Sequence, residues 1–201
     1  MTAALVIVDV QNDFCSGGAL AVPDAEAILP VVNGLVHDYR HVVVTQDWHP
    51  QGHISFASTH AGRHAFSRMA LPYGEQTLWP DHCIQGTPGA DLHPLLHVPP
   101  GAATIRKGTR QNIDSYSAFF ENDRTTPVGL DSLLRAMGVR ELVLTGLATD
   151  FCVLHTALDA RRLGYETTVV ESGCRGIDTN GSLAAAWHEM ARAGVRSRQR
   201  R

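Results

Sequence analysis

A single doubly wound α/β domain, with a mostly parallel sheet and helices on both faces, is predicted from two features of this chain. Strand-like apolar runs occupy residues 5–8, 42–46, 102–106 and 142–146, and helical patterns separate them. Uninterrupted runs of Val, Leu and Ile are typical of parallel strands that are buried on both faces. With a further run at 167–171, we expect a sheet of about five or six strands.

Helices are expected between these runs. Asp24 is a suitable N-cap for a helix that carries Ile28, Val32 and Leu35 at helical spacing. Similar patterns predict helices over residues 130–137, from about 150 to 163, and over 183–190. Residues 48–100 are irregular and rich in Pro, Gly and His, and a stretch of that length in a compact domain usually carries function or short hidden elements.

Length and composition indicate one ordinary globular domain over residues 1–201. The apolar fraction of 44% and the charged fraction of 18% are typical of such domains. The last ten residues, 192–201, contain five arginines. A short basic C-terminus of this kind is expected to be a frayed, solvated tail.

The net charge and the cysteine spacing indicate which classes of partner and which cellular compartment to expect. A net charge of -3 gives no reason to expect nucleic acid or a membrane surface as a partner. The sequence shows neither an apolar run of membrane-spanning length nor a secretory leader. Cys15, Cys83, Cys152 and Cys174 form no closely spaced pairs, which favours reduced thiols and a cytoplasmic location. The oligomeric state stays open, with a homo-oligomer among the options.

Chemically active side chains follow the ends of four predicted strands. Asp9, Asp47, Lys107 and Cys152 each lie at or shortly after such an end. Because ligands of open α/β sheets bind at the carboxyl edge of the strands, these side chains are expected to meet there. Their convergence favours an enzyme.

Cys152 is the candidate nucleophile. It falls in a predicted strand-to-helix turn, where free backbone N–H groups and the positive end of the helix dipole favour a thiolate and stabilise an oxyanion. Asp9 would then accept the thiol proton, and Lys107 would hold charge and geometry. The alternatives are a buried structural cysteine, a turn-capping aspartate and a solvated surface lysine.

A second group of residues suggests a metal. Asp47 and His49 flank one residue, so their side chains point to the same side of a strand end. Carboxylate and imidazole suit zinc, iron or manganese better than calcium. His82 is the best third ligand, and Cys83 is ranked below it. His53 is either a fourth ligand or a contact through water.

In several motifs the chain resembles the nicotinamidases (pyrazinamidases) of the isochorismatase-like cysteine hydrolases. The matching segments, in order over nearly the whole chain, are 8–20, 47–57, 79–83, 107–108, 146–152 and 174–178. The resemblance implies a catalytic triad of Asp9, Lys107 and Cys152 and a metal held by Asp47, His49 and His82.

The same resemblance implies further site residues. A cis peptide between Leu147 and Ala148 would direct the N–H groups of Ala148 and Cys152 at the oxyanion. Four side chains would line the pocket for the substrate ring: Phe14, Leu20, Trp79 and Tyr116.

The implied activity is hydrolysis of nicotinamide to nicotinate and ammonia through a thioester, in NAD salvage, with pyrazinamide also accepted. One alternative is a related amidase for another small amide or ureido compound, which would not need the metal residues. Vinyl-ether hydrolysis, as in isochorismatase, would not need Cys152. A non-enzymatic metal-binding module is the third alternative, and the intact triad argues against it.

Overall fold

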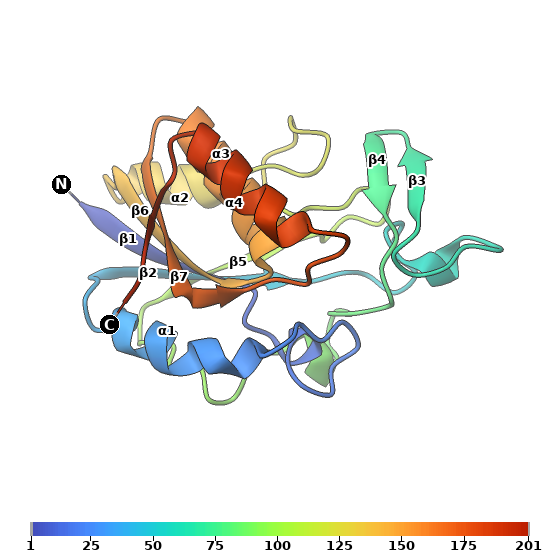
Figure 1. Ribbon diagram of the computed structural model, residues 1–201, viewed down its shortest axis with the longest axis horizontal. Helices are drawn as coiled ribbons and strands as arrows, with labels where there is room; N and C mark the ends of the chain where they lie inside the picture. The colour runs from blue at the N-terminus through green and yellow to red at the C-terminus, as the bar shows by residue number, and fades with distance from the viewer. Residues whose placement is uncertain (1, 201) are drawn as a thin grey trace.

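The computed structural model describes residues 2–200 and is built around a six-stranded parallel sheet (Figure 1). The strand order is β5-β2-β1-β6-β7-β8. The strands are β1 (Ala3–Val8), β2 (His41–Asp47), β5 (Ala103–Lys107), β6 (Glu141–Leu147), β7 (Glu166–Arg175) and β8 (Arg196–Arg198). The predicted parallel α/β fold is confirmed.

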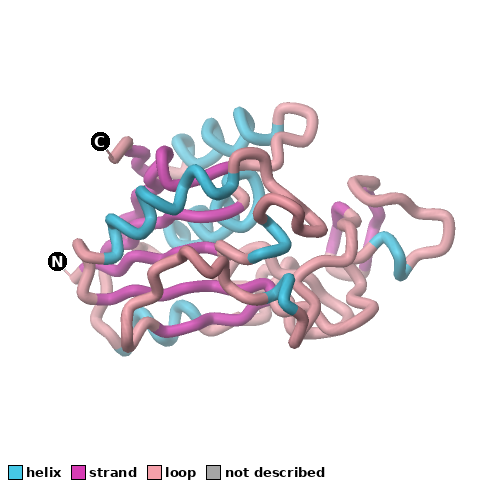
Figure 2. Tube along the Cα trace, turned by 90° about the horizontal axis from the view of Figure 1, so that it is seen from below, coloured by secondary structure: helices cyan, strands magenta, loops and turns pink. Residues whose placement is uncertain are grey.

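Helices cover both faces of the sheet, as Figures 1 and 2 show. One face carries α1 (Leu29–Val36), and the other carries α2 (Leu130–Ala136), α3 (Leu154–Arg162) and α4 (Ser182–Arg192). A short 3-10 turn, η2 (Ala25–Ile28), precedes α1. The predicted cap is wrong, because Asp24 makes no side-chain capping hydrogen bond and adopts a left-handed conformation. Within residues 2–200, no helix is both long and apolar enough to cross a bilayer.

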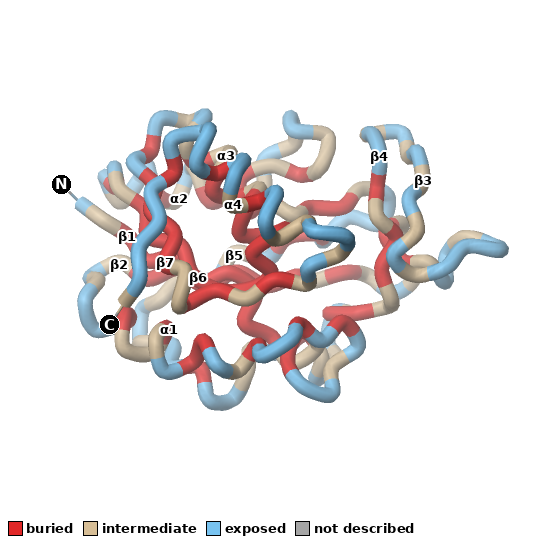
Figure 3. The backbone as a smooth tube through the Cα atoms, viewed as in Figure 1, coloured by how far each residue is buried: buried red, intermediate tan, exposed pale blue. Residues whose placement is uncertain are grey.

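The continuous apolar strands are explained by burial on both faces. In β1, Leu5 and Ile7 pack into the core beneath α1, whereas Val6 and Val8 pack into the core beneath the other three helices. Figure 3 shows the strands as a buried layer between more exposed helices. Each fully buried Leu or Ile contributes roughly 1.5–3 kcal/mol to folding, so both faces of these strands stabilise the sheet.

The strand order determines where a ligand-binding crevice can form at the end of the sheet. From β1 the chain builds outward in one direction through β2 and β5, and in the other through β6, β7 and β8. The switch in direction lies between β1 and β6, where a crevice forms outside the carboxyl ends of the strands. The chemically active residues of the sequence follow the ends of β1, β2, β5 and β6.

The irregular stretch 48–100 contains short elements. An antiparallel hairpin of β3 (Arg68–Leu71) and β4 (Gly74–Thr77) stands apart from the main sheet, at the carboxyl end of its strands (Figure 1). Two 3-10 turns, η3 (Ala57–Thr59) and η4 (Pro88–Ala90), lie on either side of the hairpin in the sequence. The hairpin leads directly into Trp79, which faces the site described below.

The expectation of a frayed basic tail is wrong for the described residues of the C-terminus. Arg196–Arg198 form β8, which pairs in parallel with β7. Arg198 donates a hydrogen bond to the Tyr39 hydroxyl, and Arg200 forms an ion pair with Asp38 at 3.1 Å. All three residues of this edge strand are exposed, and charge in such a position discourages pairing with other chains.

Gly146 provides a test of how closely β1 and β6 approach. It has a φ of +118°, and a Cβ there would lie 2.0 Å from the carbonyl oxygen of Val8. We expect Gly146→Ala to lower the free energy of unfolding by more than about 3 kcal/mol, because both backbones must shift. Gly62→Ala is the control, since Gly62 also has a positive φ but open space around it, and should lose only about 1 kcal/mol. Equal losses in chemical denaturation would refute the steric explanation.

Candidate active site

Lys107 lies at the centre of the site and joins the residues of the expected triad. Its Nζ is 2.9 Å from Oδ2 of Asp9 and 3.2 Å from the Sγ of Cys152. It also donates to Oδ1 of Asp47 and, at 3.0 Å, to the carbonyl oxygen of Ser115. All four ionisable side chains are buried. The solvated-lysine alternative is therefore excluded.

Asp9 is held by a partner that the sequence did not reveal. Immediately after β1 the backbone of Asp9 turns to a φ of +48°. Its N–H donates to the hydroxyl oxygen of Thr45 at 3.1 Å, and that hydroxyl donates to Oδ1 of Asp9 at 2.5 Å. Thr45 belongs to the neighbouring strand β2, so only the pairing of the strands brings the two residues together.

Cys152 is in a π-helical turn, η5 (Thr149–Val153), directly before α3. Turns of this type interrupt regular helices and often occur at functional sites. The peptide between Leu147 and Ala148 is cis, as the resemblance implied. Ala148 and Cys152 line the same pocket.

Burial controls the protonation of the triad. It raises the pKa of Cys152 well above the ordinary value, although Lys107 acts in the opposite direction. It also raises the pKa of Asp9, again against Lys107. The helix end is expected to favour a thiolate with Asp9 as the base, and burial of the thiol opposes its ionisation. The thiol needs a base, and Asp9, which shares Lys107 with it, has a carboxylate oxygen within 4.8 Å of the sulfur.

Asp47 behaves differently from Asp9. Burial would raise its pKa, but Lys107 and His49 hold the pKa well below its usual range, so this carboxylate stays ionised. Its two oxygens face different groups. Oδ1 receives the Lys107 hydrogen bond, and Oδ2 lies 3.7 Å from Nε2 of His49 and 3.8 Å from Nε2 of His82.

The donor set of Asp47, His49 and His82 fits a divalent transition metal. One ligand atom from each lies within 4.8 Å of the others. The Nδ1 atoms of His49 and His82 lie 3.0 and 2.7 Å from the carbonyl oxygens of Gly108 and Pro80. A carbonyl only accepts, so each Nδ1 carries the proton and each Nε2 keeps its lone pair for a metal.

His53 and Cys83 are placed differently. Nε2 of His53 donates to the carbonyl oxygen of Ile113 at 3.0 Å, and its Nδ1 pairs with the Ser55 hydroxyl at 2.7 Å. The ring stacks on that of His49, with centroids 4.4 Å apart. His53 thus packs against His49, one of the three predicted metal ligands. Cys83 is fully buried and is outside the ligand cluster formed by Asp47, His49 and His82.

An aromatic pocket connects the triad with the metal residues. It contains all four side chains that the resemblance implied for ring binding: Phe14, Leu20, Trp79 and Tyr116. Cys152, Asp47, His49 and His82 also line it. Three further lining residues were not expected from the sequence: Asp114, Phe151 and Ile177. Phe151 and Ile177 fall within the matching segments 146–152 and 174–178, so those motifs could have indicated them, whereas Asp114 lies outside every matching segment.

The aromatic walls are fixed by a buried polar network. The Tyr116 hydroxyl accepts hydrogen bonds from Nε1 of Trp79 at 3.2 Å and from Nε2 of Gln76 at 3.0 Å. Gln76 also donates to Asp114 at 2.7 Å and accepts from Asn122 at 3.0 Å. Since Gln76 comes from β4, the hairpin sets the position of the pocket wall.

Known proteins resemble this chain over most of its length. It is 52% identical over 192 residues to a nicotinamidase from Acinetobacter baylyi, covering 96% of this chain and 90% of that protein. It is 47% identical over 197 residues to a nicotinamidase from Escherichia coli, covering 96% and 92% of the two chains.

Solved structures agree with these relatives. A nicotinamidase/pyrazinamidase from Acinetobacter baumanii superposes with a TM-score of 0.97 at 52% identity, covering 98% of this chain and 96% of the other. A protein from L. infantum in complex with nicotinate gives a TM-score of 0.86 at 40% identity, covering 98% and 92%. A pyrazinamidase from Pyrococcus horikoshii in complex with zinc gives 0.82 at 34% identity, covering the whole of both chains.

The family assignment follows from a match that spans nearly the whole fold. The model of the isochorismatase domain matches residues 3–199, which include every strand of the sheet and every residue of the site. This chain therefore belongs to the isochorismatase family.

Proposed function

We propose that this protein hydrolyses nicotinamide to nicotinate and ammonia through a thioester on Cys152, and that it also accepts pyrazinamide. The observation that carries the proposal is the Lys107 ammonium, which bridges Asp9, Cys152 and Asp47, the last two of which line an aromatic pocket. The relatives named nicotinamidase and the complex of one neighbour with nicotinate support the same substrate.

In the first half of the reaction, Asp9 takes the proton of the Cys152 thiol, and the thiolate attacks the carboxamide carbon. The N–H groups of Ala148 and Cys152 are proposed to stabilise the oxyanion. As the C–N bond breaks, the proton on Asp9 passes to the departing nitrogen, which leaves as ammonia. Lys107 stays charged, because Asp47 and Asp9 raise its pKa against the effect of burial.

In the second half, water attacks the thioester carbon and Asp9 again accepts a proton. The C–S bond breaks, the proton on Asp9 returns to the sulfur, and nicotinic acid leaves and ionises to nicotinate in solution. Each proton moves between water or thiol and one carboxylate, so the raised pKa of Asp9 suits a group that must both accept and donate.

Asp47, His49 and His82 are proposed to hold one divalent metal. When bound, it would supply an open coordination position for the ring nitrogen and so orient the carboxamide toward Cys152. Zinc is favoured because a homologous pyrazinamidase was solved with it, and iron or manganese suits the same donor set. An amidase for a substrate without such a nitrogen would have no use for this cluster, which favours nicotinamidase over that alternative.

The proposal also includes a cytoplasmic location and a role in NAD salvage. All four cysteines are free thiols, which suits a reducing compartment. Nicotinate is the acid that such a pathway would reuse. Only a small molecule is proposed as partner, with no nucleic acid or membrane, and a homo-oligomer stays an open option.

Cys152→Ala should remove the nucleophile and lower kcat for ammonia release from nicotinamide by at least about 10⁴-fold. Cys174→Ala is the matched control, because Cys174 is also a buried free thiol but does not line the pocket, and it should keep its activity. Circular dichroism would confirm that both variants fold. Turnover retained by Cys152→Ala would exclude covalent catalysis.

Benzamide, which lacks the ring nitrogen, should show a kcat/KM at least about 100-fold below that of nicotinamide, because orientation by the metal is lost. Chelation should reduce activity on nicotinamide far more than the residual activity on benzamide. Equal kcat/KM values for the two amides would exclude the coordination role.

Gly108→Ala should weaken metal binding roughly 10- to 100-fold, through the orientation of His49. A Cβ at Gly108 would lie 2.4 Å from Cε1 of His49. Gly52→Ala is the control, since Gly52 also has a positive φ but only a side-chain tip at 3.9 Å. Competition with a chromogenic chelator would measure both affinities, and equal values would contradict the positioning role of Gly108.

A further inference from the structure

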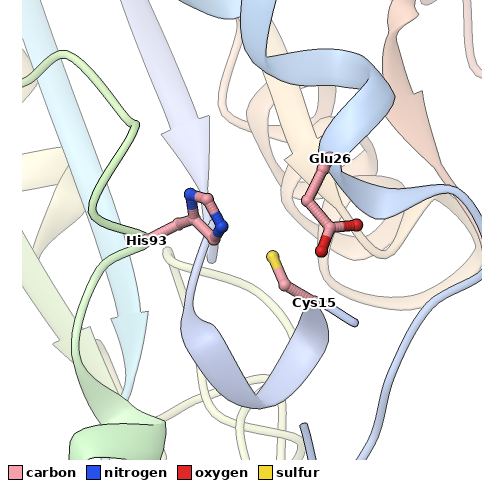
Figure 4. Close-up of side chains that lie close together, drawn as sticks. All are labelled: Cys15, Glu26 and His93. Carbon is pink, nitrogen blue, oxygen red and sulfur yellow. The ribbon is translucent and has the colours of Figure 1, made fainter. Parts of the chain in front are cut away.

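A second group of metal-ligating side chains lies away from the catalytic thiol. It consists of Cys15, Glu26 and His93, and one ligand atom from each is within 4.8 Å of the others. Figure 4 shows the three side chains pointing toward one another from separate segments of the chain. None of the three lines the aromatic pocket. We propose that this group binds a zinc ion, separately from the metal proposed for the active site.

The backbone holds the three ligands in place without help from a metal. Cys15 directly follows the turn η1 (Asn12–Phe14), and Glu26 is in η2. The N–H of His93 donates to the carbonyl oxygen of Val10 at 2.9 Å, which ties the segment of His93 to the segment of Cys15. The site is therefore built from the pairing of two loops and one turn.

Glu26 is oriented in the way that metal-binding carboxylates usually are. Its Oε1 accepts a hydrogen bond from the N–H of Ser16 at 2.8 Å, and its Oε2 accepts one from the Ser16 hydroxyl at 3.0 Å. Hydrogen bonds to a ligating carboxylate fix its direction and leave its other lone pairs for a cation. The same contacts lower the pKa of Glu26, so it is ionised.

His93 has one ring nitrogen to offer. Its Nδ1 accepts a hydrogen bond from the N–H of Leu95 at 3.2 Å, so Nε2 is the nitrogen that faces the cluster. Coordination through Nε2 moves the ring proton to Nδ1 and gives up this one long hydrogen bond. That loss is small beside the free energy of a zinc–thiolate bond.

The chemistry of the donors points to zinc. A thiolate, an imidazole and a carboxylate make a mixed set that suits tetrahedral Zn²⁺, with water in the fourth position. Cys15 is buried, whereas Glu26 and His93 are only partly buried, so an ion can enter past them. Burial and the charge of Glu26 raise the pKa of the Cys15 thiol to about 11, which argues against a reactive nucleophile here.

The position of the site suggests what bound zinc would do. Cys15 follows Phe14, which lines the aromatic pocket and packs against the His82 ring at 5.5 Å between centroids. A cation bridging Cys15, Glu26 and His93 would clamp the loop that carries Phe14. The ion would then be a structural clamp outside the reaction.

The test counts metal in purified full-length protein. After stripping with chelator, loading with zinc and gel filtration, wild type should hold about two zinc ions per chain by mass spectrometry. Cys15→Ser should hold about one, and so should His49→Ala, in which the active-site set is broken. Cys174→Ser is the matched control for loss of a buried thiol and should still hold about two. The same number of ions per chain in wild type and Cys15→Ser would overturn the proposal.

Cobalt distinguishes the two sites by their ligands. The active-site set has no thiolate, so a thiolate-to-cobalt charge-transfer band in the His49→Ala background reports Cys15. The band should vanish in His49→Ala/Cys15→Ser and persist in His49→Ala/Cys174→Ser. A band unchanged by Cys15→Ser would overturn the proposal.

Two milder variants keep the test decisive if Cys15→Ser does not fold. Glu26→Gln keeps an oxygen for Ser16, and His93→Gln changes a partly exposed side chain. In the His49→Ala background, each should weaken zinc binding at least 10-fold and abolish the rise in Tm that zinc produces. An unchanged affinity in both would also overturn it.

Discussion

The arrangement of the site depends on one buried ammonium group. Lys107 lies within hydrogen-bonding distance of Asp9, Asp47 and Cys152, all of them buried. Two carboxylates so close together inside a protein would repel each other, and a buried charge without a partner costs several kcal/mol. The lysine makes their proximity tolerable. Because it sits at the end of β5, the sheet itself fixes where this charge lies.

The same ammonium divides two carboxylates into two roles. Asp47 receives Lys107 on one oxygen and faces two histidines with the other, so it remains ionised and available to a cation. Asp9 has Thr45 and Lys107 as partners, and burial dominates its titration. Similar residues at neighbouring strand ends thus acquire different protonation behaviour from their surroundings. The proposed nucleophile and the proposed metal ligands are thus linked through a single side chain.

Two buried cysteines show that the partners of a thiol decide its chemistry. Cys152 has an ammonium at 3.2 Å and a carboxylate that shares it, which suits proton transfer and attack. Cys15 has an ionised carboxylate and an imidazole but is not in contact with Lys107, and this surrounding suits a soft divalent cation. The two thiols are buried to a similar extent, so burial alone does not distinguish their chemistry. The charges around each sulfur distinguish the proposed nucleophile from the proposed zinc ligand.

Much of the fold follows from local pattern. Continuous apolar runs that end in polar residues indicate parallel strands, and the carboxyl-edge rule places Asp9, Asp47 and Lys107 together. The pattern could not show β8, because Arg196–Arg198 form a strand only by pairing with an existing edge. Nor could it show the β3–β4 hairpin, whose strands have only four residues each and follow no continuous apolar run.

The chemistry of the active site was therefore encoded in residue types at strand ends, together with family motifs that name the triad, the ligands and the ring pocket. Only the tertiary structure determined the hydrogen-bond partners of the site residues. Thr45 meets Asp9, Gln76 meets Tyr116, and the ring nitrogens of His53 pair with Ser55 and Ile113. The positions of these residues in the chain do not show how far apart their side chains lie in space. Hydrogen-bond directions and burial determine proton positions and pKa shifts, and both are set only when the sheet and the loops have assembled.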